Sequence, residues 1–407
     1  MKKKINLKYP LYFKEFECIG GKCEDSCCIG WDIDIDKQSF RKYHKVDNDE
    51  MREMFHKNVH NNPDYTDAEI DYGKIKLNAD KRCPFLDQCN YCIIYSKLGE
   101  DYLSNVCTHF PRVMNKVDGQ FEISLDIACP EAARIILNKE EGIEFAQNDE
   151  SINKYIISGT IDTKQKEYED HPLRYFKEIR KFCLDLMKNR EYTLNERMYV
   201  LGDFLYALEE ECEYDCSNVL EFIDNYNIKE VASEYEKNSL NYILQISFFK
   251  NVVDSLNILE EIDSEKFKEA TRELLQGLDI KDKEDLAENP HKYIDAFELY
   301  NEKYIDKYNY IFENYIINFI YNNLFPFSES DSMFEGYIML LVRYSFMKFY
   351  LAGKYMNNKH ESKDDIVKFV QVFSKAIEHD KNYMLEVLDY IIENGYDNME
   401  FAKMLIL

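Results

Sequence analysis

The chain has 407 residues, with 51 Lys or Arg against 77 Asp or Glu, so its formal net charge is −26. That charge argues against nucleic-acid binding as the main role, because contact with phosphates needs a basic face. A hydrophobic content of 45% allows a sizeable core and excludes a chain that is disordered throughout. The length fits two or three domains, or one large one.

Cysteine and charge are both distributed unevenly along the chain. Nine of the 12 cysteines lie among the first 129 residues. The first 130 residues hold 19 basic and 22 acidic residues, whereas the remainder holds 32 and 55. A polar segment at 140–170, poor in long apolar periods, separates the two compositions. We therefore expect a cysteine-rich, nearly neutral domain over residues 1–140 and an acidic, all-helical domain over residues 141–407.

Short strands are predicted in the N-terminal part. Residues 31–36 and 121–127 alternate apolar and polar side chains, and residues 70–77 do so in part. Alternation with a period of two is typical of a strand that is buried on one face.

Helices are predicted from about residue 171 onward. Only 13 Gly and 8 Pro interrupt the chain, and apolar residues recur at steps of three or four on one face: Leu173, Phe176, Ile179, Phe182, Cys183 and Leu186. Capping-box patterns begin at Thr193 and, more loosely, at Ser362. Eight to ten helices are expected, with breaks at Pro290 and Pro326. The predicted fold class is mainly α, with a cysteine-rich metal-binding N-terminal part that has a few short strands, followed by a multi-helix domain.

The compartment is expected to be the cytoplasm. The basic start at Met1 is followed by no apolar run long enough for a signal peptide, and no stretch of 18 apolar residues occurs, so no membrane span is expected. In a reducing cytoplasm, clustered cysteines are more often metal ligands or redox groups than disulfides.

The N-terminal cysteines are the candidate metal ligands. Thiolates suit zinc or the irons of an iron–sulfur cluster. Short spacings let two ligands reach one centre with a small entropic cost of loop closure. Nine thiols allow one four-ligand site with spare cysteines, or two sites. A proline follows two of them, as is common beside iron–sulfur ligands; buried structural cysteines are the alternative. The nine are Cys18, Cys23, Cys27, Cys28, Cys83, Cys89, Cys92, Cys107 and Cys129.

Other residues carry weaker signals. His109 lies two residues after Cys107 and could be a ligand or a capping residue, and Trp31 could cover a metal site. Cys212 and Cys216 share a helix face and are expected to be structural. The chain has none of the common phosphate-loop, dinucleotide, zinc-protease or nucleophile-elbow motifs.

Several spaced motifs within residues 9–135 resemble, in order, the N-terminal part of FliB-type flagellin lysine-N-methylases. The first motif is also similar to CxxCxxCC zinc- or iron-chelating proteins, with looser spacing. The matching residues are Tyr9-Pro10, Phe16-x-Cys18, Cys23-Glu24-Asp25-x-Cys27-Cys28-x-Gly30-Trp31, Arg82-Cys83-Pro84-Phe85-Leu86, Cys89, Cys92, Gly99-Glu100, Leu103-Ser104, Cys107, Phe110-Pro111-Arg112, Ser124-Leu125 and Cys129-Pro130-Glu131-Ala132-Ala133-Arg134.

The resemblance implies methyl transfer from S-adenosylmethionine to lysine side chains of flagellin. It also implies an iron–sulfur cluster, of the 4Fe–4S type, in the cysteine-rich part, with zinc as the alternative. No glycine-rich cofactor loop is present, so S-adenosylmethionine would be held in some other way.

Lysine attacks a methyl group only as a neutral amine, and its free pKa is about 10.4. An acceptor site therefore needs a group that takes the proton. The candidates beside the cysteine motifs are Glu24, Asp25, Glu100 and Glu131, each of which could equally be a capping or solvated carboxylate. Arg82 and Arg112 could bind the carboxylate of the cofactor, or offset thiolate charge.

Two other functions stay open on the sequence. One is a non-enzymatic zinc- or iron-binding module whose helical domain engages a partner protein. The other is an iron–sulfur redox protein. The acidic helical part could attract a lysine-bearing substrate, or could simply be a soluble surface.

Overall fold

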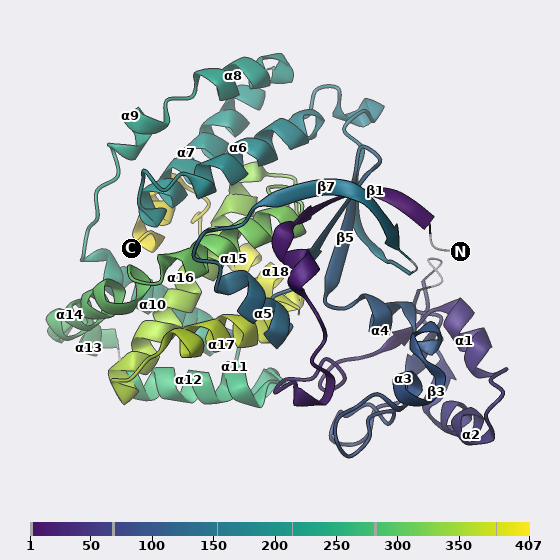
Figure 1. Cartoon of the computed structure of the whole chain (residues 1–407). Coiled ribbons are helices and arrows are strands. Elements are labelled where there is room, and N and C mark those ends of the chain that lie inside the picture. The colour runs from purple at the N-terminus through teal and green to yellow at the C-terminus, as the bar shows by residue number, and fades with distance from the viewer. Residues whose placement is uncertain (1–2, 67–69, 153, 214, 281–282, 380) are drawn as a thin grey trace. The chain divides into compact units, whose positions relative to one another are not determined.

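The computed structural model describes residues 3–66, 70–152, 154–213, 215–280, 283–379 and 381–407 (Figure 1). The chain forms two compact units. The N-terminal unit comprises Met1–Lys116, Gln120–Ala132 and Phe145–Thr160, and the helical unit comprises Val117–Gly119, Ala133–Glu144 and Ile161–Leu407. The predicted mainly α fold with a few short strands in its N-terminal part is confirmed: the described residues form 19 α-helices, and all of their strands lie before residue 162. That the N-terminal part binds a metal stays a prediction.

A five-stranded sheet in the order β7-β1-β6-β5-β8 forms part of the N-terminal unit. β1 pairs in parallel with β6 and antiparallel with β7, so that Leu7 lies opposite both Phe121 and Asn148 (Figure 1). Alternate residues of β1, Ile5, Leu7 and Tyr9, form a core with neighbouring strands. The strands are β1 (Lys3–Pro10), β5 (Arg112–Val117), β6 (Gln120–Leu125), β7 (Phe145–Ile152) and β8 (Ile157–Ile161).

A second, three-stranded sheet has the order β2-β4-β3. It packs with short helices around a core in which the rings of Tyr43 and Phe55 stack 4.0 Å apart. The elements are β2 (Asp34–Ile35), β3 (Val59–Asn61), β4 (Gly73–Ile75), α1 (Lys37–Tyr43), α2 (Asp49–Asn58), α3 (Ile93–Leu98) and α4 (Asn105–His109).

Asp36 ties two of these helices together. One oxygen of its buried carboxylate accepts from the backbone N–H of Ser39 at the start of α1, and the other accepts from that of Asn105 at the start of α4, both at 2.8 Å. A carboxylate is favourable at the positive end of each helix, so one side chain fixes two helix starts.

The three predicted strands are present in shortened form as β2, β4 and β6. The other strands were not predicted. β1 alternates apolar residues with lysine and asparagine, a pattern that the sequence reasoning missed. β7 is an edge strand with only two clearly apolar residues in its first half and one at its end, so it has no alternating pattern.

Fourteen α-helices follow residue 171 in the described residues, more than the eight to ten expected, because several have only four to seven residues and carry too few turns for a periodic signal. Both capping boxes are present. Pro290 opens a helix, and Pro326 lies in the turn after another. The helices are α6 (Phe176–Lys188), α7 (Leu194–Cys212), α8 (Val219–Asn225), α9 (Ile228–Ala232), α10 (Asn241–Ser255), α11 (Ile258–Glu261), α12 (Glu265–Leu278), α13 (Lys283–Glu288), α14 (Pro290–Tyr300), α15 (Asn309–Asn322), α16 (Met333–Asn358), α17 (Lys363–Phe373), α18 (Lys381–Glu393) and α19 (Met399–Leu405). α5 (Pro130–Leu137) precedes them.

The core of the helical unit is built around α16, which has 26 residues, 21 of them buried. α7, α10, α12, α14, α17 and α19 all pack against it. α12 approaches most closely at a pair of glycines: a Cβ on Gly277 would lie 1.9 Å from the carbonyl oxygen of Gly353. Glycine at both positions lets the two backbones meet.

Buried charge in the helical unit is compensated locally. The carboxylate of Glu313 on α15 accepts from Arg190 at 2.7 Å and from Arg197 at 2.8 Å. Glu313 and Arg197 are each almost fully buried, so removal of either one would leave the other buried without this partner. Within the described residues, no helix combines the length and apolar character that crossing a membrane requires.

Candidate functional site

Two loops of the N-terminal unit are joined so that distant cysteines meet. The backbone N–H of Cys83 donates to the carbonyl of Cys28 at 2.9 Å, and Ile29 and Arg82 form an isolated β-bridge beside them. A second bridge joins Leu86 to Cys92. Segments far apart in the sequence therefore enter one small region.

Four thiols belong to the resulting cluster: Cys28, Cys83, Cys92 and Cys107. Cys83 interacts electrostatically with the other three, and Cys28 also interacts with Cys92 and Cys107. All four contribute to the same hydrophobic core. We refer to them as the four-cysteine cluster.

A second group of thiols adjoins this cluster. Cys129 interacts with Cys18 and Cys23, and Cys27 connects the two groups because it interacts with Cys28, Cys107 and Cys129. Cys89 is exposed on a turn, and its backbone N–H donates to Asp87. None of the interactions just described includes Cys89. No disulfide joins the cysteines, all twelve of which are described.

Backbone N–H groups point at several of these sulfurs. They come two or three residues after each cysteine: Phe85 donates to Cys83, Ile94 and Tyr95 to Cys92, Glu131 and Ala132 to Cys129, and Asp25 to Cys23. Cys92 and Cys129 immediately precede helices α3 and α5, whose first N–H groups are otherwise without helical partners. Such donors favour the thiolate form, which is the form that binds metals.

Burial acts in the opposite direction. Burial first, and then neighbouring thiols, raise the pKa of Cys83, Cys107 and Cys129 to about 12. The pKa of Cys27 is raised chiefly by its hydrogen bond with Cys28 and then by burial. A set of buried thiols that receives N–H donors is suited to a metal centre that would supply further positive charge.

Two orphaned polar atoms lie beside the cluster. The hydroxyl of Tyr43, which interacts with Cys83, Cys92 and Cys107, has no hydrogen-bond partner among the described residues. Neither has Nε2 of His109, whose pKa is lowered to about 4 by burial and by Arg112. Two buried polar atoms without partners in the described part of the chain are consistent with a site that binds a further group, such as a metal centre.

The thiols are not arranged around one point as the ligands of a metal ion would be. Within the described parts of the chain, no three His, Cys, Asp or Glu side chains surround one point closely enough to hold a metal ion. The donor chemistry therefore fits a sulfur-bound metal, while the ligand set stays a prediction.

The four predicted acid–base carboxylates lie at the same cysteine segments. Glu24 and Asp25 both raise the pKa of Cys23, and Glu24 is exposed. Glu131 begins α5 next to Cys129, and Glu100 is exposed in the loop before α4. Nothing in this placement selects one of them as a base, so all four stay predictions.

The two predicted arginines differ in environment. Arg112 is half-buried, its guanidinium lies 5.4 Å from the ring centre of Phe16, and burial lowers its pKa while Glu100, Cys18 and Cys129 raise it. This placement matches the neutralising role considered above. Arg82 donates to the carbonyl of Asp87 at 2.6 Å. Trp31 donates from its indole to the carbonyl of Cys27 and packs edge-on against Phe110, and its role as a cover over a metal site stays a prediction.

Ser104 is a site residue that the sequence reasoning missed. It is fully buried, caps α4 by accepting from the backbone N–H of Cys107, and lowers the pKa of that thiol by a hydrogen bond. Its position three residues before a cysteine was the available signal, since serine is a preferred helix cap.

Comparison with known proteins assigns the family. Residues 180–405 match the model of the FliB lysine N-methylase C-terminal domain. The chain is 24% identical over 402 residues to the lysine-N-methylases of Salmonella typhimurium and Salmonella choleraesuis, covering 93% of each chain.

It is also 30% identical over 171 residues to the flagellar biosynthetic protein FliU of Salmonella muenchen, covering 41% of this chain and 96% of that protein. No solved structure matches. The chain belongs to the FliB lysine N-methylase family.

Proposed function

We propose that the chain is a cytoplasmic enzyme that transfers a methyl group from S-adenosylmethionine to lysine side chains of flagellin. The observation that carries this proposal is similarity to lysine-N-methylases over 93% of both chains, so that both units have counterparts in proteins of that name. The flagellar name of the relative FliU supports flagellin as the substrate. A reducing compartment would keep the clustered thiols available to a metal.

The proposal includes a 4Fe–4S cluster held by Cys28, Cys83, Cys92 and Cys107. Mutual proximity of these thiols, a purely sulfur donor set and N–H donors to two of the sulfurs support it. Zinc would suit the same four thiolates and is the alternative metal. Measurement of the metal content distinguishes zinc from iron.

The chain's own residues would then prepare the acceptor. S-adenosylmethionine would supply the methyl group, and Arg112 or Arg82 would hold its carboxylate through a forked pair of hydrogen bonds. The substrate amine must lose a proton before it attacks. One of the four predicted carboxylates, Glu24, Asp25, Glu100 or Glu131, would take that proton.

The test combines metal content with methyl transfer. Protein purified without oxygen should contain iron and sulfide and absorb broadly in the visible range, and it should place label from S-adenosylmethionine on flagellin lysines. Stoichiometric zinc without iron would contradict the proposed 4Fe–4S cluster. An intact cluster with no label on lysine would contradict the methylase function and favour a non-enzymatic binding module.

A further inference from the structure

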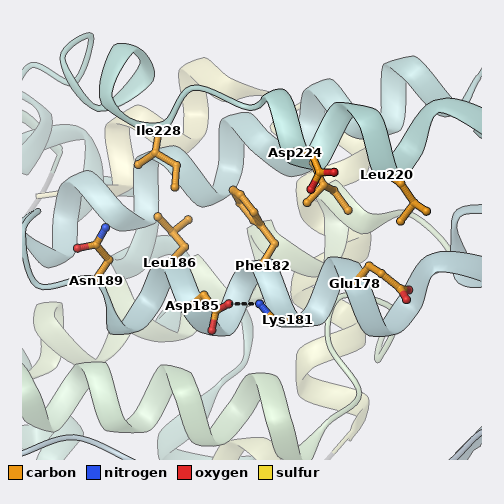
Figure 2. Close-up of a pocket in the computed structure, with 10 residues that line it drawn as sticks. Glu178, Lys181, Phe182, Asp185, Leu186, Asn189, Leu220, Asp224 and Ile228 are labelled. Atoms are coloured by element: carbon orange, nitrogen blue, oxygen red, sulfur yellow. Dashed lines mark hydrogen bonds and ion pairs between the residues drawn. The ribbon is translucent and has the colours of Figure 1, made fainter.

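A groove of about 400 Å³ lies in the helical unit, between α6 on one side and α8 and the start of α9 on the other (Figure 2). Phe182 and Leu186 project from α6 toward Leu220 and Ile228 across it. The sequence pattern assigned Phe182 to the buried face of its helix. It is instead partly exposed, because it forms the floor of this groove.

The floor of the groove is firmly held. The ring of Phe182 stacks on Phe204 with centroids 3.9 Å apart and meets Tyr226 edge-on at 5.6 Å. Tyr226 in turn donates to Asp203 at 2.6 Å. A floor fixed by packed rings costs little entropy when a partner binds to it.

Acidic groups border this apolar floor. The lining includes Glu178, Asp185 and Asp224, with Lys181 as the basic residue, and Lys181 is held by Asp185 at 2.6 Å. The surrounding chain is more acidic still: residues 209–236 contain ten Asp or Glu and one lysine. A segment that fills the groove would therefore meet a border with more acidic than basic side chains.

The walls of the groove determine the kind of segment that fits. They are helices, whose backbone groups bond within each helix, so an extended strand would find no sheet edge to join. Along α6 the lining runs from Glu178 to Asn189, about 17 Å of helix at 1.5 Å per residue. That length suits roughly three turns of a partner helix.

We propose that this groove docks an amphipathic, lysine-bearing helix of the protein substrate, with apolar side chains on the ring floor and lysines toward the acidic border. The assignment of the occupant rests on the proposed function, because a lysine-methylating enzyme must recruit a protein that presents lysines. The groove would thus recruit the substrate by side chains separate from those that react.

The test uses two variants in the groove, each with a matched control on α18. Leu220→Asp places a charge on the apolar lining, and Leu385→Asp does the same at a leucine of almost equal exposure, 49% against 48%. Asp224→Lys reverses a charge at the border, and Glu386→Lys reverses an exposed charge elsewhere. All four positions are exposed, and circular dichroism checks that each variant is folded.

Affinity for unmodified flagellin is measured by calorimetry at low and high salt. Leu220→Asp should weaken binding about tenfold and Asp224→Lys about threefold, the latter effect shrinking as salt rises. The KM for flagellin should rise in parallel while kcat stays unchanged, and a short lysine peptide should be methylated at the normal rate. Both controls should bind as the unaltered chain does.

Three outcomes would overturn the docking proposal. Unchanged affinity and KM in both groove variants would do so, as would equal effects in the α18 controls. So would a change of oligomeric state with Leu220→Asp, which would assign the groove to a second copy of this chain. If the variants lose flagellin binding but the unaltered chain transfers no methyl group, the docking proposal stands and the proposed function fails.

Discussion

The two units of the molecule are stabilised in different ways. In the N-terminal unit, helices α1 to α4 have only five to ten residues each, and the clustered thiols lie in α4 and in the segments before α1 and α3. In the helical unit, a 26-residue helix is buried on all sides by its neighbours. The first arrangement is typical of a region that needs a bound metal to hold its loops, and the second of a region held by its own packing. Four experiments break or sharpen that comparison.

Cys83→Ser should have the largest effect. A serine hydroxyl is a poor ligand for soft metals, so metal content should fall to background and the N-terminal unit should lose its protection from hydrogen exchange, while the helical unit keeps its own. Cys89→Ser, at an exposed cysteine of the same segment, should retain metal and protection. If Cys83→Ser keeps its full metal content, Cys83 is not a ligand, and the proposed contrast between a metal-held unit and a unit held by packing loses its support.

Glu313→Ala should act on the helical unit alone. It leaves Arg197 buried without its carboxylate, which should lower the free energy of unfolding by about 3–5 kcal/mol. Glu265→Ala removes an exposed carboxylate that also lies near two cations, and should cost less than about 1 kcal/mol. Urea unfolding followed by circular dichroism measures both. Equal losses would show that burial of the pair does not matter.

Gly277→Ala should lower stability by about 1–3 kcal/mol, because its methyl group would meet the backbone of α16 and force two helices apart. Gly353→Ala should cost less, since the nearest atom to its added methyl group is the end of the Leu274 side chain, which can turn away. Thermal unfolding ranks the two variants. A larger loss of stability in Gly353→Ala would mean that the backbone contact at Gly277 is relieved by a small shift, whereas the Leu274 side chain cannot turn away.

Two buried ionisable groups should give the smallest effects, seen only as pH dependence. Burial lowers the pKa of Lys348 to about 7, so its contribution to stability is complete above its unfolded pKa of about 10.4 and is lost as the pH falls toward 7. Burial raises the pKa of Glu361 to about 7, so its contribution is complete below about 4.3 and is lost as the pH rises toward 7.

Lys348→Met should therefore flatten the alkaline side of a stability–pH profile, and Glu361→Gln the acidic side. Melting temperatures measured from pH 4 to about pH 10 separate the two. An unchanged profile in either variant would show that the group titrates normally in the folded chain.

Local features of the fold could be predicted from the sequence, whereas distant pairings could not. The capping box at Thr193 depends on residues three positions apart, so its pattern is visible in the chain. The pairing of β1 with β7 joins residues more than 130 positions apart, and polar side chains on both strands hide it. α16 has buried residues around its whole circumference, and most of them are apolar, so its pattern has only a weak helical period.

The candidate site shows the same limit. Cysteine count and spacing named nine candidate ligands, but not which of them lie close together. That grouping depends on the bridge between Ile29 and Arg82 and on the carboxylate of Asp36, which fixes the start of the helix that carries Cys107. None of these contacts leaves a motif in the sequence.

The burial of α16 has a consequence for how the protein is made. Synthesis completes this helix before α17 and α19, which cover part of it in the finished unit. Until those last residues emerge, this long and largely apolar helix is without its full cover, and its exposed apolar side chains favour association with other chains. We expect the nascent chain to need a chaperone at this stage, and truncation just before α17 to yield aggregates rather than a smaller folded protein.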